Sequence, residues 1–257
     1  MLTNESLTVS HEGRVLRLTL NRPDKRNALS VDLCHALASA FEAALKNPEV
    51  GVILLAANGP VFSAGMDLDE ALHPDAAQRS YIHEKLFTIG ARSNKPIVAA
   101  VQGPALGGGL GLVANAHVAI AAQGCTFGLT EIRIAMWPFV IFRSIKAAVG
   151  ERRALQLSLT GRIFNTAEAM QWGFIHEVAP AVELDDRAMA IATQLAEASS
   201  QTIAAGLEFV HVTREADAMS FGKLAAEYRG RVFESADFVE GITAFHEKRK
   251  PRWPAST

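Results

Sequence analysis

A run of glycines, GPALGGGLGL at residues 103–112, contains the groups in this sequence that are best suited to chemistry. The run follows the apolar segment 96–101 and leads into a helical pattern, so it occupies the turn between a strand and a helix. Amide N–H groups at a helix N-terminus are unpaired and carry partial positive charge, and glycine leaves them uncovered. Such a turn can bind a phosphate, or it can hold a carbonyl oxygen on which negative charge develops. Close packing of the helix on a buried strand is the purely structural alternative.

The known phosphate-binding motifs fit this run poorly. A Walker loop requires a Gly-Lys-Ser/Thr ending, and no lysine lies between Lys95 and Lys146. A dinucleotide fingerprint can be placed over residues 109–114, but the preceding strand ends too early for the tight turn. The next apolar strand ends in Gln123, where a ribose requires an acid. We therefore favour an oxyanion-binding turn.

The first charged residue after the glycine run is a candidate functional group. Residues 96–130 contain no Asp, Glu, Lys or Arg, but Pro104 and seven glycines make a membrane-spanning helix a poor interpretation. A buried strand–turn–helix–strand unit fits better, and Glu131 is the first charge to emerge from it. A carboxylate in that position is either partnered or functional.

Two further loops could complete a site. The segment VFSAGMDL at 61–68 follows the apolar strand 50–55, so a bare amide beside Gly65 could supply a second oxyanion donor. An ordinary strand-to-helix loop, with Asp67 starting the helix, is the alternative. The loop 21–29 clusters three cations, which are either solvated surface or contacts to a phosphorylated substrate tail. No Gly-x-Ser-x-Gly nucleophile motif and no metal-like histidine pair is present.

Composition agrees with a cytoplasmic enzyme. The 257 residues fit one large domain, with or without a small appendage, and the net charge of −2 favours neither nucleic acid nor a membrane surface as partner. Cys34 and Cys125 are expected to be reduced core residues without metal-ligand spacing. The hydrophilic start lacks the apolar region of a signal peptide.

Strand and helix patterns alternate along the first three quarters of the chain. Ser30 is expected to cap a helix whose apolar face carries Leu33, Leu37, Phe41 and Leu45. The remaining expected elements are strands at 15–20, 50–55, 96–101, 117–122 and 174–178 and helices near 142–159 and 166–172. From about residue 183 onward the pattern is helical. The sequence therefore predicts an α/β core followed by a helical tail.

Taken together, the segments resemble the crotonase superfamily, also called the enoyl-CoA hydratase/isomerase family. The matching segments span nearly the whole chain in the family's order: NRPDKRNALS, FSAGMDL, KPIVAAVQGPALGGGLGL, FGLTEIRIAMWP, LTGRIFNTAEAMQWGFIHEV and AFHEKRKPRW. The resemblance implies an α/β fold, a crotonase-like spiral of ββα units over residues 1–195. It also implies a C-terminal helical region, 196–257, that forms a homotrimer or a hexamer built as a dimer of trimers.

The resemblance also implies a site for an acyl-CoA thioester, which is the substrate and not a cofactor, with no metal. The thioester oxygen would lie between the N–H groups of Met66 and Gly108. The residues expected to contact CoA are Lys25, Arg26, Ala28, Ala64, Asp67, Leu68, Phe245 and Lys248, the last two in a neighbouring subunit's site. Trp137 and Phe139 are expected to line the acyl pocket, and Glu131 matches a catalytic glutamate of the family.

One departure from the family's hydratases decides which reaction we favour. Those enzymes hold water between two glutamates, and the position of the first is Gly111 here. Single-glutamate members resemble Δ3,Δ2-enoyl-CoA isomerases, in which one carboxylate moves a proton from C2 to C4. We therefore favour isomerisation over hydration of a 2-enoyl-CoA. Asp69, Glu70 or Glu84 could replace the missing acid, and a hydrolase, a decarboxylase or a non-catalytic scaffold of the same fold are further alternatives.

Overall fold

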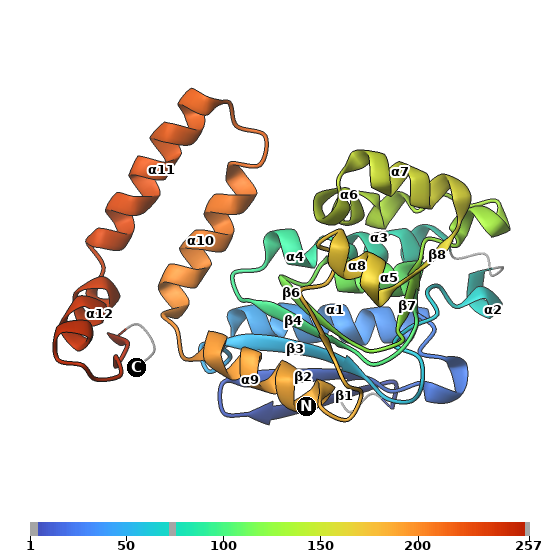
Figure 1. Cartoon of the computed structure of the whole chain (residues 1–257), viewed down its shortest axis with the longest axis horizontal. Helices are drawn as coiled ribbons and strands as arrows, with labels where there is room; N and C mark the ends of the chain where they lie inside the picture. The colour runs from blue at the N-terminus through green and yellow to red at the C-terminus, as the bar shows by residue number, and fades with distance from the viewer. Residues whose placement is uncertain (1–4, 72–75, 255–257) are drawn as a thin grey trace.

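The chain folds into two β-sheets with helices packed around them (Figure 1). The computed structural model describes residues 5–71 and 76–254. It describes the side chains of all these residues except 76–80. In these residues the strands are β1 (Leu7–Glu12), β2 (Val15–Leu20), β3 (Val52–Ala57), β4 (Ile97–Val101), β5 (Ala105–Leu106), β6 (Val118–Ala122), β7 (Thr126–Gly128), β8 (Ile163–Asn165) and β9 (Glu177–Ala179).

Helices connect and cover these strands. Within the same residues the first α-helices are α1 (Val31–Lys46), α2 (Leu68–Ala71), α3 (Ala76–Phe87), α4 (Ile89–Arg92), α5 (Gly108–Ala114) and α6 (Phe139–Val149). The later ones are α7 (Glu151–Thr160), α8 (Thr166–Gln171), α9 (Leu184–Ala196), α10 (Ser200–Val212), α11 (Ala218–Phe233) and α12 (Ala236–His246). Two short 3-10 helices are η1 (Pro23–Lys25) and η2 (Glu131–Ile134).

The larger sheet has the strand order β1-β2-β3-β4-β6-β9. β1 is antiparallel to β2, and the remaining neighbours are parallel. Every residue of β4 is buried, which explains its continuous apolar sequence IVAAV, because a central parallel strand is covered on both faces. The carboxyl ends of β3, β4 and β6 therefore meet at one edge, and the loops that follow them share that edge.

The smaller sheet, in the order β5-β7-β8, gives the fold its spiral. β4 in the large sheet is followed by β5 in the small one, and β6 is followed by β7 in the same way. This alternation is the spiral of ββα units that the sequence predicted. In it, the units that begin with β4 and β6 each place one strand in each sheet before their helix, whereas β1 and β2 both belong to the larger sheet.

The expected first helix is confirmed. The Ser30 hydroxyl accepts a hydrogen bond from the Leu33 N–H at 3.2 Å, which satisfies one of the unpaired donors at the start of α1. Leu33, Leu37 and Phe41 are fully buried, and Leu45 packs on the core from a partly buried position. The helix ends at Lys46, just before β3 enters the sheet.

Two boundary predictions were wrong. The helix expected over 142–159 is two helices, α6 and α7, because Gly150 adopts φ +78° and ψ 159°, outside the helical region. The strand expected at 174–178 begins only at Glu177. Phe174 and Ile175 are buried in the turn after α8, so their apolar character reflects core packing and not strand pairing.

The last three helices lie to one side of the rest of the chain (Figure 1). α9 still packs on β3 and β4, whereas α10 contacts α4 and α11, and α11 contacts α12. Across the described part of the chain, helices that are both apolar and long enough to cross a membrane are absent.

Candidate active site

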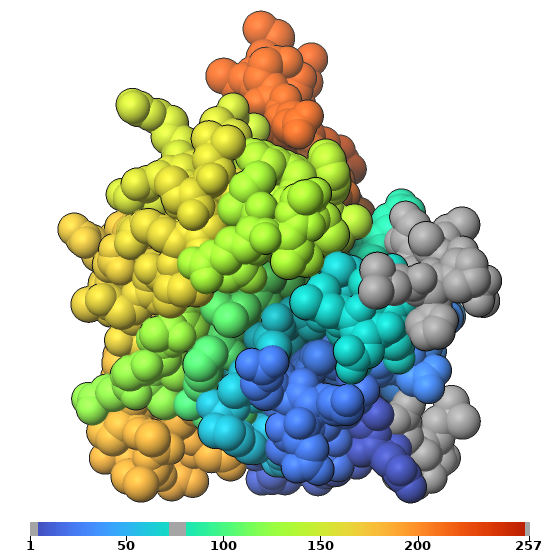
Figure 2. Space-filling view, turned by 90° about the vertical axis from the view of Figure 1, so that its right-hand side faces the viewer, coloured from blue at the N-terminus to red at the C-terminus, as the bar shows by residue number. Residues whose placement is uncertain are grey.

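The two loops that follow β3 and β4 are joined by backbone hydrogen bonds. The Leu106 N–H donates to the Ser63 carbonyl at 3.0 Å, and the Ser63 N–H donates to the Pro104 carbonyl at 3.2 Å. Figure 2 views the molecule from the side of α2, where early (blue) and later (cyan and green) segments lie next to one another at the surface. The loop at 61–68 and the glycine run therefore form one structural unit, as their positions after parallel strands predicted.

Glycines are required where these loops touch. Gly65 has φ +89°, and a Cβ there would lie 2.8 Å from the Leu106 carbonyl oxygen. A Cβ on Gly109 would lie 2.5 Å from the Ser63 carbonyl oxygen. Side chains at these positions would therefore separate the two loops. The glycine run is thus structural in part, which the sequence left as an alternative to its chemical role.

The amides of Met66 and Gly108 are free for a ligand. The Gly65 carbonyl accepts a hydrogen bond from the Leu29 N–H at 2.8 Å. Because that carbonyl and the Met66 N–H belong to one planar trans peptide, the N–H points the opposite way. The Gly107 carbonyl likewise accepts from the Gly111 N–H at 3.0 Å, which leaves the Gly108 N–H at the open end of α5. Neither amide has a hydrogen-bond acceptor among the described residues.

Glu131 faces the glycine run, and no ion pair joins it to another described residue. The pairing of β5 with β7 holds the Gly107 N–H on the Gly128 carbonyl at 2.9 Å and places η2 beside the run. A Cβ on Gly107 would lie 3.1 Å from Oε1 of Glu131, whose residue is only 7 % exposed. Its buried Oε2 has no hydrogen-bond partner among the described residues. Burial raises the pKa of this carboxyl, and a backbone hydrogen bond opposes the rise.

No second acid stands at the position of the missing glutamate. A Cβ on Gly111 would lie 2.3 Å from Cγ2 of Ile141, so α6 fills the space that a side chain would need. Of the proposed replacements, Asp69 is exposed and lies 3.5 Å from the Lys25 ammonium. Glu70 accepts a hydrogen bond from the Val31 N–H at 2.8 Å and so serves the start of α1. Glu84 is exposed on α3.

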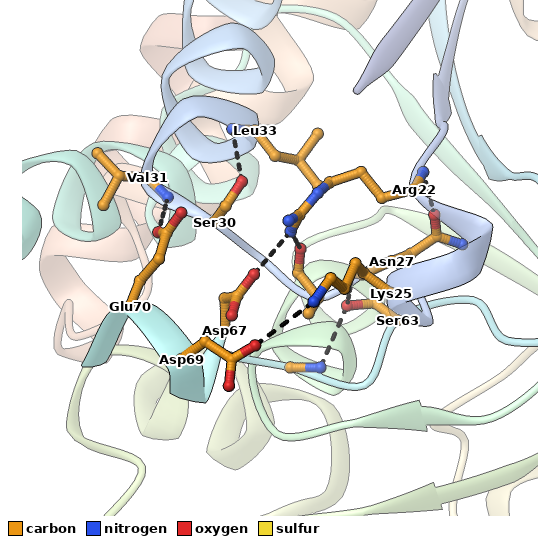
Figure 3. Close-up of polar contacts among 12 residues, drawn as sticks. Arg22, Lys25, Asn27, Ser30, Val31, Leu33, Ser63, Asp67, Asp69 and Glu70 are labelled. Atoms are coloured by element: carbon orange, nitrogen blue, oxygen red, sulfur yellow. Dashed lines mark hydrogen bonds and ion pairs between the residues drawn. The ribbon is translucent and has the colours of Figure 1, made fainter. Parts of the chain in front are cut away.

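Most of the loop 21–29 supports the neighbouring loop (Figure 3). The Arg22 guanidinium bonds both to the Asp67 carboxylate at 2.9 Å and to the Ala28 carbonyl at 2.6 Å. The Asn27 side-chain amide, fully buried, donates to the carbonyls of Asn58 and Val61, each at 2.8 Å. Arg22 is therefore not a solvated cation, and the Asp67 carboxylate expected near CoA is engaged with it.

The other residues expected to contact CoA fall into two groups. Lys25, Arg26 and Leu68 are exposed, and Ala28 and Ala64 are partly buried, on the two loops joined to the glycine run. Phe245, 80 % exposed, and Lys248 lie at the end of α12, which Figure 1 places far from α5. A single chain therefore does not bring these two residues to the glycine run.

Trp137 and Phe139 follow Glu131 but point to different surroundings. Trp137 is partly buried against Phe142, with ring centroids 5.9 Å apart. Phe139 is 78 % exposed and lines a cavity together with Phe87. Sequence reasoning missed Phe87 and Ile141, because α3 and α6 reach the glycine run only through tertiary packing. The sequence did offer a signal for Asn27. Asparagine tolerates a positive φ better than most residues, and Asn27 adopts a φ of 49°.

Known proteins are similar to this chain over nearly its whole length. A family model described as enoyl-CoA hydratase/isomerase covers residues 10–256. A probable enoyl-CoA hydratase of Bacillus subtilis is 34% identical over 254 residues, covering 96% of this chain and 98% of that protein. A 2,3-dehydroadipyl-CoA hydratase of Escherichia coli is 34% identical over 250 residues, with coverages of 95% and 97%. The crystal structure of a Mycobacterium smegmatis enoyl-CoA hydratase superposes with a TM-score of 0.91 at 27% identity, covering 97% of this chain and 99% of that one.

Proposed function

We propose that this chain, which belongs to the enoyl-CoA hydratase/isomerase family, converts 3-enoyl-CoA thioesters to 2-enoyl-CoA thioesters with Glu131 as its one proton carrier. The observation that carries this proposal is the closed space at Gly111, where Ile141 occupies the position of a second carboxylate. A second acid is needed to orient and deprotonate water, whereas moving one proton along a chain needs only one. Glu131, buried and without a counter-ion, has the properties of that base.

The proposed reaction uses the two free amides and the carboxylate together. The Glu131 carboxylate removes a proton from C2, and the C–H electrons move into the thioester to give an enolate oxygen. The N–H groups of Met66 and Gly108 stabilise that oxygen, aided by the dipole of α5. The carboxylic acid then returns its proton to C4, and the double bond moves from C3–C4 to C2–C3. No cofactor enters this scheme, because the acyl-CoA is the substrate.

Hydration of 2-enoyl-CoA is the second candidate, and the names of the relatives favour it. Several similar proteins are described as hydratases, including those of B. subtilis and E. coli. Hydration here would require an acid outside the family's usual position. Asp69 and Glu70 are both engaged elsewhere, so Glu84 would be the remaining candidate of the three.

Assays of both reactions with three proteins test the proposal. The wild type should isomerise a 3-enoyl-CoA and hydrate the corresponding 2-enoyl-CoA poorly. Glu131→Gln should lose isomerisation while still binding acyl-CoA, because an amide cannot carry the proton. Glu49→Gln, at an exposed position away from the site, should match the wild type. Fast hydration by the wild type, sensitive to Glu84→Gln, would contradict the proposal.

The closed space at Gly111 allows a second, constructive test. Gly111→Glu alone should fold poorly or remain inactive in hydration, because its Cβ would collide with Ile141. Combining Gly111→Glu with Ile141→Ala should remove the 2.3 Å contact to Cγ2, leaving a 2.9 Å contact to the remaining Cβ that a small shift of α6 can relieve, and should raise hydration above the wild-type level. Ile141→Ala alone is the matched control. If Gly111→Glu by itself gave a stable, active hydratase, Ile141 would not be the reason for the missing acid.

A further inference from the structure

A cavity of about 370 Å³ lies behind the proposed site, between α3, α5, α6 and α10. Its lining is apolar in part, at residues such as Ala114, Phe87, Val140 and Leu207, and polar in part, at residues such as Asn115 and His117. It is bounded by two segments that also touch the glycine run, namely the end of α3 and the start of α6. The cavity therefore adjoins the site, although neither Met66 nor Gly108 lines it.

Phe87 separates this cavity from the glycine run. Its ring tip, Cζ, lies 3.2 Å from where a Cβ on Gly108 would stand, and its Cδ1 lies 3.2 Å from the corresponding position on Gly111. The same side chain lines the cavity and is 4 % exposed. Phe87 is therefore a wall with the thioester-binding amide on one side and the cavity on the other.

The outer rim of the cavity carries two cations without partners. Arg143 on α6 and Arg214, just after α10, are exposed and line the cavity. Their guanidinium groups have no hydrogen-bond or ion-pair partner among the described residues. Glu84 is the only carboxylate among the lining residues, so fixed positive charges outnumber negative ones two to one.

We propose that this cavity is a subsite for the distal end of an acyl chain that carries a terminal carboxylate. The apolar part of the lining suits the methylene groups, and Arg143 and Arg214 suit the carboxylate, because guanidinium groups form charge-assisted hydrogen bonds to it. Phe87 sets which chains enter, since its ring must turn aside for a chain bound at Gly108. The inference rests on the proposed acyl-CoA function and narrows its substrate class to ω-carboxylated acyl-CoA.

Binding of saturated thioesters tests the subsite without chemistry. Suberyl-CoA and octanoyl-CoA have the same chain length and differ in the terminal carboxylate, and neither has a double bond to move. In calorimetric titrations, Arg143→Ala/Arg214→Ala should weaken suberyl-CoA binding about tenfold, the loss expected for a charge-assisted contact, and leave octanoyl-CoA binding unchanged. Arg152→Ala/Lys223→Ala removes the same charge from exposed positions outside the cavity and should change neither.

Variants of Phe87 test whether its side chain limits the entry of acyl chains into the cavity. Phe87→Leu should strengthen binding of both eight-carbon thioesters relative to butyryl-CoA, and Phe87→Trp should weaken it. Equal effects of the arginine variants on suberyl-CoA and octanoyl-CoA would overturn the carboxylate assignment. If both Phe87 variants kept the chain-length preference of the wild type, Phe87 would not control which chains enter the cavity. Failure of the isomerase proposal would appear separately, as specific binding of these thioesters without turnover of any 3-enoyl-CoA.

Discussion

Glu131 is a carboxylate that folding places in an unfavourable environment. Its buried Oε2 has no partner among the described residues, and burial raises its pKa above the ordinary value of 4.5. Stabilising side chains are not arranged in this way, because an unpaired buried charge opposes folding. A base that must take a proton from a weakly acidic C–H group benefits from the same arrangement.

Stability measurements against pH should show this conflict. In the native state Glu131 binds its proton more tightly than in the unfolded state, so native stability falls as pH rises from about 4.5 through the raised pKa. Glu131→Gln has no charge at this position, so it should be more stable than the wild type at neutral pH. The advantage should disappear below about pH 4, where both states of the wild type are protonated. Chemical denaturation of both proteins across this range measures it, and a variant that is less stable at pH 7 would contradict the assignment.

The sequence predicted the residues that we propose act on the thioester, but not those that shape the space around them. Gly108, Met66 and Glu131 belong to local motifs, so their positions follow from strand ends and turns. Ile141 and Phe87 reach the glycine run from α6 and α3. Their roles depend on how helices pack, which no local pattern in one sequence reveals.

At the scale of elements, polar side chains hold together the loops 21–29 and 61–68, which lie beside the free amides of Met66 and Gly108. Arg22 ties the Ala28 carbonyl to the Asp67 carboxylate, and these two residues flank the bridge between Leu29 and Met66. The pair is well shielded, with side-chain exposures of 19% and 9%. The bridge in turn fixes the peptide plane that directs the Met66 N–H into the site. We therefore expect Arg22 and Asp67 to position the amide rather than to bind CoA.

Kinetics of Arg22→Ala and Asp67→Asn should separate these roles. Each variant should lower kcat about 10- to 100-fold, the effect of a misplaced group, with little change in the affinity for CoA. Lys25→Ala is the contrasting variant, because its ion pair with Asp69 is exposed and contributes little to stability. It should weaken CoA binding and leave kcat near the wild-type value. A loss of CoA affinity in Asp67→Asn larger than its loss of kcat would restore Asp67 as a CoA ligand.

Element boundaries were predicted where caps and apolar periodicity agree. Ser30 and the stripe from Leu33 to Phe41 identified α1 correctly. The prediction of one helix over 142–159 was wrong because the apolar period continues across Gly150, although its backbone leaves the helical region there. Periodicity reports which side chains are buried, and a break of one residue leaves that pattern almost unchanged.

At the scale of the whole molecule, the C-terminal helices lack a core of their own. Within α10–α12 the buried residues are Tyr228, Asp237 and Ala244. Large apolar side chains on the same helices are exposed, among them Phe233, Val239, Ile242 and Phe245. Isolated helices of this length are marginal in water, so their stability must come from packing against another surface. We expect that surface to belong to further copies of this chain, in a trimer or a hexamer.

Light scattering at micromolar concentration tests this assembly. The wild type should have the mass of three or six chains, and Val239→Asp/Ile242→Asp should shift it toward the monomer, because charges on α12 would be buried at the contact. Val182→Asp is the matched control, since Val182 is 90 % exposed and lies before α9, outside the helical tail. If Phe245 and Lys248 reach a neighbouring subunit's site, the affinity for acyl-CoA should fall when the assembly is lost. A wild-type protein that remains monomeric and binds acyl-CoA at full affinity would show instead that α10–α12 serve the single chain.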